Sequence, residues 1–324
     1  MALLSVPDWM DIIKSSALQA MTSGNFRKEV KMPNSYKHRS GDRKEGRLLR
    51  SLPASSKFVP YSLPDRDGAS FFLDEDLDVT DAEKCLKVEQ DGGYEGIGFL
   101  HFFIAAYIRC LSMLPGMNRF IVGRRIFARN DIDIVLTVKR SSTVEGSETQ
   151  VKIRFDPTDT IFDVYRKINE RIDELKTEDF SSSREDLAEA AANAPRLFVR
   201  LGFLVLRILD YLGWRPQKYL DKSLAHASLV INDASLFNSS PVFHQIGNFG
   251  TLPIHISIGE SQHVFEMERS GLVADTKHIR CMATVDSRLA EPHYYAQFLN
   301  AMRYIFAHPE ILERSPSRVV EDIG

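Results

Sequence analysis

Apolar positions recur at three- and four-residue steps in several segments of the chain, the period of a helix with one buried face. The clearest case covers residues 97–111 and is ended by a Pro-Gly pair at 115–116. The same period predicts amphipathic helices at residues 160–175 and 293–306. A weaker pattern in residues 1–24 predicts a short helix or a docking arm.

Alternation of apolar and polar positions predicts strands between these helices. It is found near residues 72–79, at 120–127 around a turn at Gly123, at 132–139 and at 150–156. Residues 227–285 are expected to be mostly strand, interrupted by glycines. The order strand, helix, strands, helix, helical insert, strands, helix indicates an α/β or α+β fold with one mixed sheet.

A helical insert is predicted at about 178–222, with helices at 184–193 and 195–213. The second is apolar but contains Arg200, Arg207 and Asp210. Each such charge near a bilayer centre costs about 2.5–3.5 kcal/mol, so this helix should not cross a membrane. Its apolar side chains must be covered by protein, and three possibilities stay open. The helix could form a lid on a substrate tunnel, a surface for an apolar partner, or additional core or trimer packing.

The 324 residues are 44% hydrophobic, enough for one large domain or two small ones. A net charge of −3 argues against wholesale nucleic-acid binding. Residues 25–50 carry nine Lys/Arg against three acids and predict a basic, subunit-wrapping arm or a contact for an anionic partner such as a nucleotide phosphate or a lipid surface. We therefore divide the chain into a helix and arm at 1–55 and a domain at 56–324 that contains the insert.

Cys85, Cys110 and Cys281 match no disulfide or zinc spacing, which favours a reducing compartment. The N-terminal residues lack the features of a signal peptide, so a cytoplasmic location is expected. Cys110 lies in the apolar helix and should be in the core. Histidines at 255, 263 and 278 lack a metal-coordinating spacing, and neither a metal nor a covalent cofactor is expected.

Four segments, in order, resemble the catalytic domain of the 2-oxo acid dehydrogenase acyltransferases (dihydrolipoyl acyltransferases), which is itself similar to chloramphenicol acetyltransferase. They begin FFLDEDLDVT, GIGFLHFFIAAY, SLVINDASLF and ATVDSRLAEP, and together span roughly 60–175 and 222–313. The resemblance implies a chloramphenicol acetyltransferase-like two-layer sandwich with a mixed β-sheet. It also implies a homotrimer with the active site between subunits, and coenzyme A or acyl-CoA as ligand.

The family's catalytic signature, His-x-x-x-Asp-Gly, falls on a degenerate stretch of this chain. Ser287 stands at the histidine position, Glu291 at the aspartate and Pro292 at the glycine, whereas the flanking Asp286 and Arg288 remain. The histidine is the family's general base, and losing a positioned base costs about 10²–10⁴ in rate. Serine titrates too high to replace it; Glu291 could do so if buried, or could serve a structural ion pair with Arg288.

Other residues of the matching segments could contribute to a site. The resemblance assigns the oxyanion donor to Asn232, with Ser228 nearby, and an amide can donate as a hydroxyl does. His244, on a polar loop, is the first choice for a substitute base or a ligand-binding group; otherwise it is a loop histidine bonded to backbone. His226 precedes a strand, and His293 is expected to cap or begin the last helix.

Two functions follow from the resemblance. One is the role of a pseudoenzyme: a degenerate family member that forms a trimer and binds coenzyme A or acyl-CoA in an intersubunit tunnel without the standard histidine. The other is an active, stand-alone acyl-CoA-dependent acyltransferase that uses another base. No segment resembles a lipoyl hairpin or an Ala/Pro-rich linker, so shuttling of acyl groups within a dehydrogenase complex is not expected.

Overall fold

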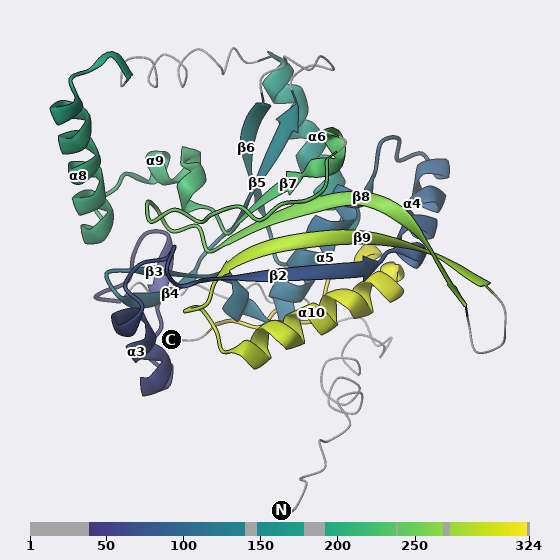
Figure 1. The fold of residues 1–324 in the computed structure, drawn as a ribbon, viewed down its shortest axis with the longest axis horizontal. Helices are drawn as coiled ribbons and strands as arrows, with labels where there is room; N and C mark the ends of the chain where they lie inside the picture. The colour runs from purple at the N-terminus through teal and green to yellow at the C-terminus, as the bar shows by residue number, and fades with distance from the viewer. Residues whose placement is uncertain (1–38, 140–147, 178–191, 238, 268–272, 323–324) are drawn as a thin grey trace, which may run out of the picture.

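The computed structural model describes residues 39–139, 148–177, 192–237, 239–267 and 273–322. Its centre is a six-stranded mixed sheet (Figure 1). In spatial order the strands are β2 (Ser70–Asp78), β9 (Val273–Asp286), β8 (Ile254–Met267), β7 (Leu229–Asp233), β5 (Ile132–Lys139) and β6 (Glu148–Phe155). β7 runs parallel to both of its neighbours, and the other pairs are antiparallel.

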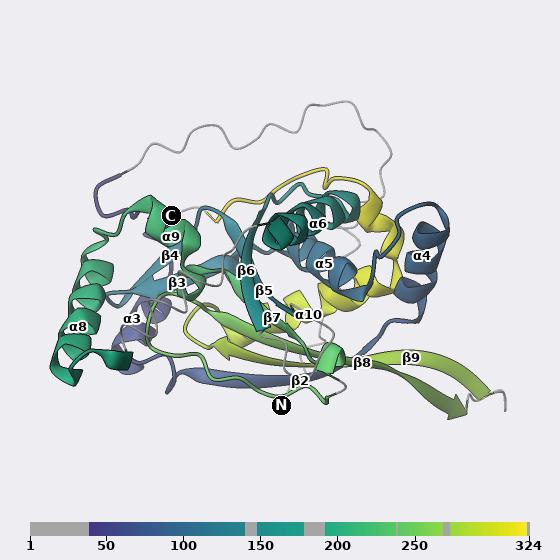
Figure 2. The same cartoon turned by 90° about the horizontal axis from the view of Figure 1, so that it is seen from above.

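Four helices cover one face of this sheet, as Figure 2 shows from above. They are α4 (Thr80–Asp91), α5 (Phe99–Met113), α6 (Ile161–Thr177) and α10 (Pro292–Ala307). Their apolar sides and the inner face of the sheet form one large core cluster, in which Cys110 is fully buried as expected. The predicted fold class, an α/β two-layer arrangement with a mixed sheet, is confirmed.

The helix predicted first, α5, lies at the centre of the core. Eleven of its fifteen residues are buried, because it packs between α6, α10 and the sheet. Three short 3-10 helices, η2 (Pro115–Asn118), η4 (Ala234–Phe237) and η5 (Pro309–Glu313), connect the layers. Two helices were not predicted from the pattern, α4 and α3 (Ala54–Ser62).

A small second sheet lies beside the main one, in the order β1 (Gly46–Leu48), β4 (Arg125–Arg129), β3 (Arg119–Val122). The single strand expected at 120–127 is the β3–β4 hairpin, and its two turn residues, Gly123 and Arg124, have φ of 58° and 61°. Positive φ at both central positions is the signature of a tight hairpin turn. β1 lies in the segment assigned to the basic arm and pairs with β4.

The insert contains α8 (Arg196–Leu212) and α9 (Gln217–Lys222), and η3 (Leu224–His226) follows it. The helix predicted at 195–213 is α8. It ends at Gly213, whose φ of 72° allows the left-handed cap. Figure 1 shows α8 at the left edge, apart from the main sheet. The helix predicted at 1–24 and all but the last two residues of the helix predicted at 184–193 lie outside the described residues. Within the described part of the chain, no helix combines the length and apolarity that crossing a bilayer requires.

Candidate functional site

The degenerate motif begins at the buried end of β9, with Asp286. Its carboxylate accepts two hydrogen bonds from Arg288, Nε to Oδ1 and Nη2 to Oδ2, both at 2.8 Å. The Nε of Arg66 lies 3.7 Å from the same Oδ2. All three side chains are at most 5% exposed. The aspartate and arginine that the sequence retains therefore form a buried, two-point ion pair.

The two arginines extend this ion pair to neighbouring loops. Arg66 donates to the carbonyl oxygens of Gly247 and Gly250 at 2.9 and 2.7 Å. Arg288 donates to the backbone oxygens of residues 63 and 64, both at 3.0 Å. Burial lowers the pKa of Arg66 to about 10, with Asp286 opposing the shift, so it stays charged at neutral pH. We call Arg66, Asp286 and Arg288 the Asp286 network. It connects the end of β9 to residues 63–66 and to the backbone of Gly247 and Gly250.

The remaining motif positions do not converge on this network. The backbone N–H of Ser287 donates to the oxygen of Ala69 at 3.0 Å. Glu291 is exposed at the start of α10, and its carboxylate lies 3.5 Å from Nδ1 of the exposed His293. His293 is the second residue of α10, so its predicted position at the beginning of the last helix is confirmed. Arg288 thus pairs with Asp286, and Glu291 takes no part in a buried ion pair.

A second polar group lies on the sheet face away from the helices. Alternate residues of β8 point to opposite faces, so its isoleucines enter the core and His255 points outward. The ring of His244, from the loop between β7 and β8, stacks on His255 with centroids 4.2 Å apart and planes at 8°. Asn232, on β7, lies with Nδ2 3.2 Å from Nε2 of His244. The structure therefore brings two of the predicted site residues into contact.

Three buried polar atoms around this contact have no hydrogen-bond partner among the described residues. They are Oδ1 of Asn232, Nε2 of His255 and Oγ1 of Thr284. Thr284 lies directly opposite His255 in the β8–β9 ladder. Buried polar groups in native proteins are nearly always paired, so each exception needs an explanation. We call His244, His255, Asn232 and Thr284 the His244 cluster.

The charge state of the cluster follows from the burial of His255. Burial, with a smaller contribution from His244, lowers the pKa of His255 to about 4. The ring is therefore neutral at pH 7, with one nitrogen donating and the other accepting. Neutral His255, with an amide and a hydroxyl nearby, can therefore exchange hydrogen bonds with an uncharged polar ligand.

The Asp286 network and the His244 cluster are neighbours. Thr284 and Asp286 are two residues apart on one face of β9, a spacing of about 7 Å. The loop of residues 241–250 carries His244, and the carbonyl groups bound by Arg66 belong to the same loop. Phe243, next to His244, packs edge-on against Phe72 of β2 with centroids 5.1 Å apart. The network thus holds the loop that presents His244 to the sheet.

Ser228 and His226 lie elsewhere. The hydroxyl of Ser228 is buried at the opposite end of β7, where it accepts the N–H of Asp133 at 3.1 Å. His226 is also buried, with Nε2 3.1 Å from Asp210 and Nδ1 2.7 Å from Ser223. Ser228 is thus part of the sheet beside β5, and His226 is part of the contact with the insert. His255, Thr284 and Arg66 were not predicted as site residues.

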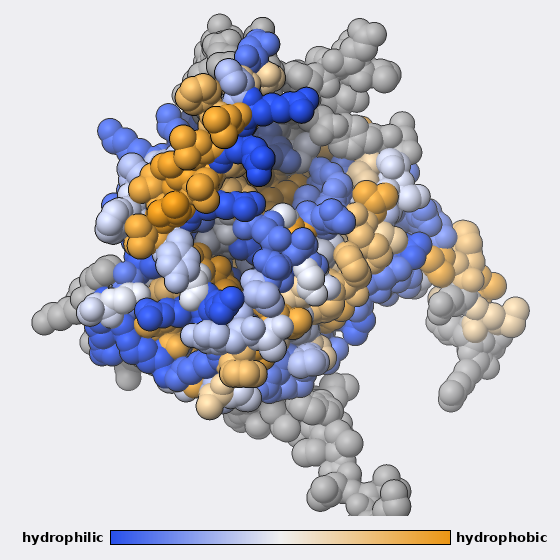
Figure 3. Space-filling view, turned by 60° about the vertical axis from the view of Figure 1, so that its left-hand side comes forward, coloured by the Kyte–Doolittle hydropathy of each residue, from blue (hydrophilic) through white to orange (hydrophobic). Residues whose placement is uncertain are grey.

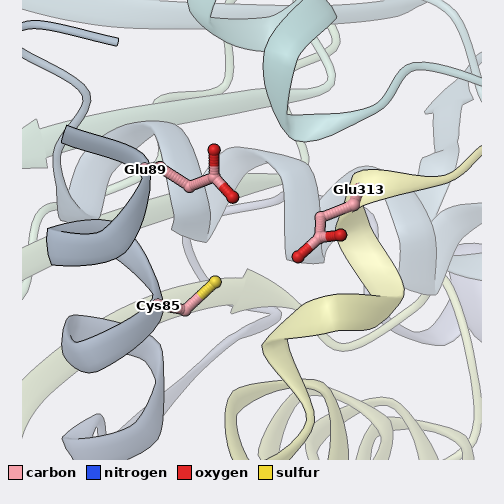
Figure 4. Close-up of side chains that lie close together, drawn as sticks. All are labelled: Cys85, Glu89 and Glu313. Atoms are coloured by element: carbon pink, nitrogen blue, oxygen red, sulfur yellow. The ribbon is translucent and has the colours of Figure 1, made fainter. Parts of the chain in front are cut away.

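One group of possible metal ligands occurs in the described residues, Cys85 and Glu89 on α4 with Glu313 of η5 (Figure 4). Metal coordination by cysteine requires the thiolate. Burial and the neighbouring carboxylates raise the pKa of the Cys85 thiol, which disfavours that form. Glu313 is exposed. The group carries no metal assignment.

The six-stranded mixed sheet with helices on one face matches the fold of a solved acetyltransferase. A probable dihydrolipoamide acetyltransferase from Listeria monocytogenes 4b F2365 superposes with a TM-score of 0.51 and 12% identity, over 80% of this chain and 94% of that chain. This likeness establishes the fold and leaves the function open.

Two further solved structures are similar at lower scores. Dihydrolipoamide acetyltransferase from Azotobacter vinelandii has a TM-score of 0.49 and 13% identity, over 89% of this chain and 99% of that one. A chloramphenicol acetyltransferase has a TM-score of 0.49 and 10% identity, over 82% and 97%. No protein-family model and no curated protein sequence matches the chain.

Proposed function

We propose that this protein binds coenzyme A or an acyl-CoA on the outer face of the sheet, at the His244 cluster, without the histidine of the standard motif. The observation that carries the proposal is the set of buried, unpartnered polar atoms of Asn232, His255 and Thr284. The pantetheine arm of coenzyme A contains two amide groups, each with one donor and one acceptor. Such an arm matches a neutral group of donors and acceptors better than a charged ligand would.

The proposal includes a homotrimer with the ligand between subunits. Around the cluster the outer face exposes large apolar side chains: Phe72 is 57%, Val242 52% and Phe243 41% exposed. Exposed apolar patches rimmed by polar groups mark interaction sites. A second subunit placed there would cover these side chains and close the ligand site. Light scattering of the purified protein tests this part, and a monomer would contradict it.

Acyl transfer is the second candidate, favoured by the contact between His244 and Asn232. A His244 nitrogen would take the proton of an acceptor thiol or hydroxyl, whose sulfur or oxygen would attack the thioester carbonyl. The bond from the carbonyl carbon to the CoA sulfur would break, and the proton would return to the CoA thiolate. In the free protein the Asn232 amide nitrogen faces Nε2 of His244, so this hydrogen bond has to open before the Nε2 lone pair can accept the proton.

Calorimetric titration with coenzyme A and acetyl-CoA tests binding, and release of free CoA thiol with a panel of thiol and alcohol acceptors tests transfer. Asn232→Ala and His244→Ala should each weaken binding about five- to tenfold, because each removes one or two uncharged hydrogen-bonding groups. His263→Ala is the matched control, since His263 is exposed and pairs with Asp275 in the distal part of the β8–β9 hairpin.

The outcomes separate the candidates. Binding by the wild type with no thiol release supports the binding role and contradicts transfer. Thiol release that is lost in His244→Ala and kept in His263→Ala supports transfer. If neither variant of the cluster binds more weakly than His263→Ala, the cluster is not the ligand site.

A further inference from the structure

The helix α8 carries a stripe of large apolar side chains that the rest of the chain leaves exposed. They recur at four- and three-residue steps, which places them on one side of the helix. Figure 3 shows this stripe as a ridge of hydrophobic surface with hydrophilic residues alongside. Its members are Leu197, Leu201, Leu204, Ile208 and Tyr211, which are 73%, 53%, 53%, 48% and 65% exposed.

Arginines run along one flank of the stripe. Arg196, Arg200 and Arg207 each precede a stripe residue by one position and are exposed. The one acid of α8, Asp210, is buried, so the exposed side chains of this helix carry a formal charge of +3. Arginine stems can lie along an apolar surface while the guanidinium reaches polar surroundings. The helix therefore combines an apolar face with a cationic flank.

The positive charge continues onto the turn that supports the end of α8. The β3–β4 turn carries exposed Arg124 and Arg125, and its Gly123 lies against the ring of Tyr211. Trp214, just beyond the helix, is 69% exposed. Tyrosine and tryptophan favour the boundary between a membrane and water, where one end of the ring is apolar and the other is wet.

The helix is held at one end. Arg43 donates to the backbone oxygen of Asp210, and the Asp210 carboxylate lies 3.1 Å from Nε2 of His226. Burial alone would raise the pKa of Asp210, but the hydrogen bond to His226 and the charges of His226, Arg215 and Arg43 lower it. This paired, buried carboxylate fixes the last turn of α8. The apolar stripe can therefore remain presented to a partner without being needed to hold the helix in place.

We propose that α8 and the β3–β4 turn dock this protein on a membrane surface rich in anionic lipid. The apolar stripe enters the boundary between headgroups and acyl chains, and the arginines contact the phosphates. Interfacial helices have this combination of an apolar face, Lys/Arg and aromatic residues. The charge of this surface indicates the partner. The five exposed arginines on α8 and the β3–β4 turn match an anionic surface, and a bilayer rich in anionic lipid presents negative charge along its whole area. The inference does not depend on the acyl-CoA site.

Vesicle co-sedimentation of the full chain tests the proposal. Phosphatidylcholine vesicles with added phosphatidylserine should bind the protein, phosphatidylcholine alone should bind it much less, and added salt should weaken the binding. Leu201→Asp with Ile208→Asp should weaken binding more than a hundredfold, estimated at about 1.5–3 kcal/mol for each buried side chain. Arg200→Gln with Arg207→Gln should weaken it about thirtyfold on anionic vesicles only.

Phe265→Asp with Val273→Asp is the matched control, because these side chains are 68% and 63% exposed on the distant β8–β9 hairpin. Circular dichroism and thermal melting confirm that every variant folds. The proposal is overturned if the wild type does not bind anionic vesicles, or if the control loses binding equally. It is also overturned if Leu201→Asp with Ile208→Asp dissociates an oligomer while vesicle binding is absent, since a second copy of this chain would then cover α8.

Discussion

Two polar groups share one face of the sheet, two residues apart along β9, and they use their hydrogen bonds differently. In the Asp286 network both carboxylate oxygens are bound by Arg288, and Arg66 adds a third charge and two backbone contacts. In the His244 cluster three buried polar atoms lack a partner in the described structure. The cluster is also less buried than the network, since His244, His255 and Asn232 are half-buried.

The difference concerns what each group stabilises. A fully paired buried network gains nothing further from a ligand, and its removal costs folding free energy. A buried polar atom without a partner costs free energy in the unbound protein and recovers it when a ligand supplies the hydrogen bond. Asp286 and Arg288 of the motif are thus structural in this chain, and the proposed ligand site lies with residues around them.

Removal of the Asp286 carboxylate should have the largest effect. Asp286→Ala leaves the buried Arg66 and Arg288 without their counter-charge, and we expect the free energy of unfolding to fall by about 3–5 kcal/mol. Urea denaturation measures this loss. Asp74→Ala is the control, since its pair with Arg280 is 42% and 58% exposed and should contribute far less to stability. Equal losses in the two variants would contradict the structural role of the network.

Lowering the pH should destabilise the protein through His255 of the His244 cluster. The pKa of His255 is about 4 when folded and 6.5 ordinarily, so between these values the unfolded chain binds a proton that the folded chain does not. Stability should therefore fall as pH falls through this window, by about 2 kcal/mol at pH 5. His255→Gln should remove that part of the pH dependence in denaturation at pH 5 and 7.5. The prediction is contradicted if His255→Gln keeps the pH dependence of the wild type. It is also contradicted if His263→Gln removes that dependence equally.

The smallest predicted change in the free energy of unfolding concerns two buried threonines, and its sign differs between them. Thr284→Val removes a hydroxyl without a partner and keeps the shape, so the free energy of unfolding should rise by up to about 1 kcal/mol. Thr251→Val removes a hydroxyl that accepts a hydrogen bond from Arg129 at 3.1 Å, and should lower it by about 1–3 kcal/mol. Denaturation measures both. Destabilisation by Thr284→Val would mean that its hydroxyl is satisfied in the free protein.

The sequence predicted those elements whose apolar pattern has one clear period. α5, α6, α8 and α10 show helical spacing, and β7 to β9 lie within the region assigned to strands. α4 was missed because only Ala82 and Leu86 are buried, too few for a visible apolar stripe. α3 contains Pro60, which normally argues against a helix interior. Both helices depend on packing against the rest of the chain more than on their own pattern.

The site was predicted only in part. His244 and Asn232 were selected one by one, and their contact follows from the way the 241–250 loop folds back over β7 and β8. His255 and Thr284 join them because the β8–β9 register places them opposite each other. Arg66 reaches this loop from more than 180 positions away in the sequence. None of these long-range pairings has a local signal in the sequence.

The attachment of α8 also has a mechanical consequence. The 17-residue helix is about 25 Å long, and its last turn is fixed by Arg43 and His226. Along its inner side, Phe203 meets the ring of Phe249 with centroids 5.9 Å apart. Phe249 lies between the two glycines that Arg66 binds, on the loop that carries His244. α8 is therefore in contact with the loop that carries His244, and a tilt of the helix would act on Phe249 within that loop.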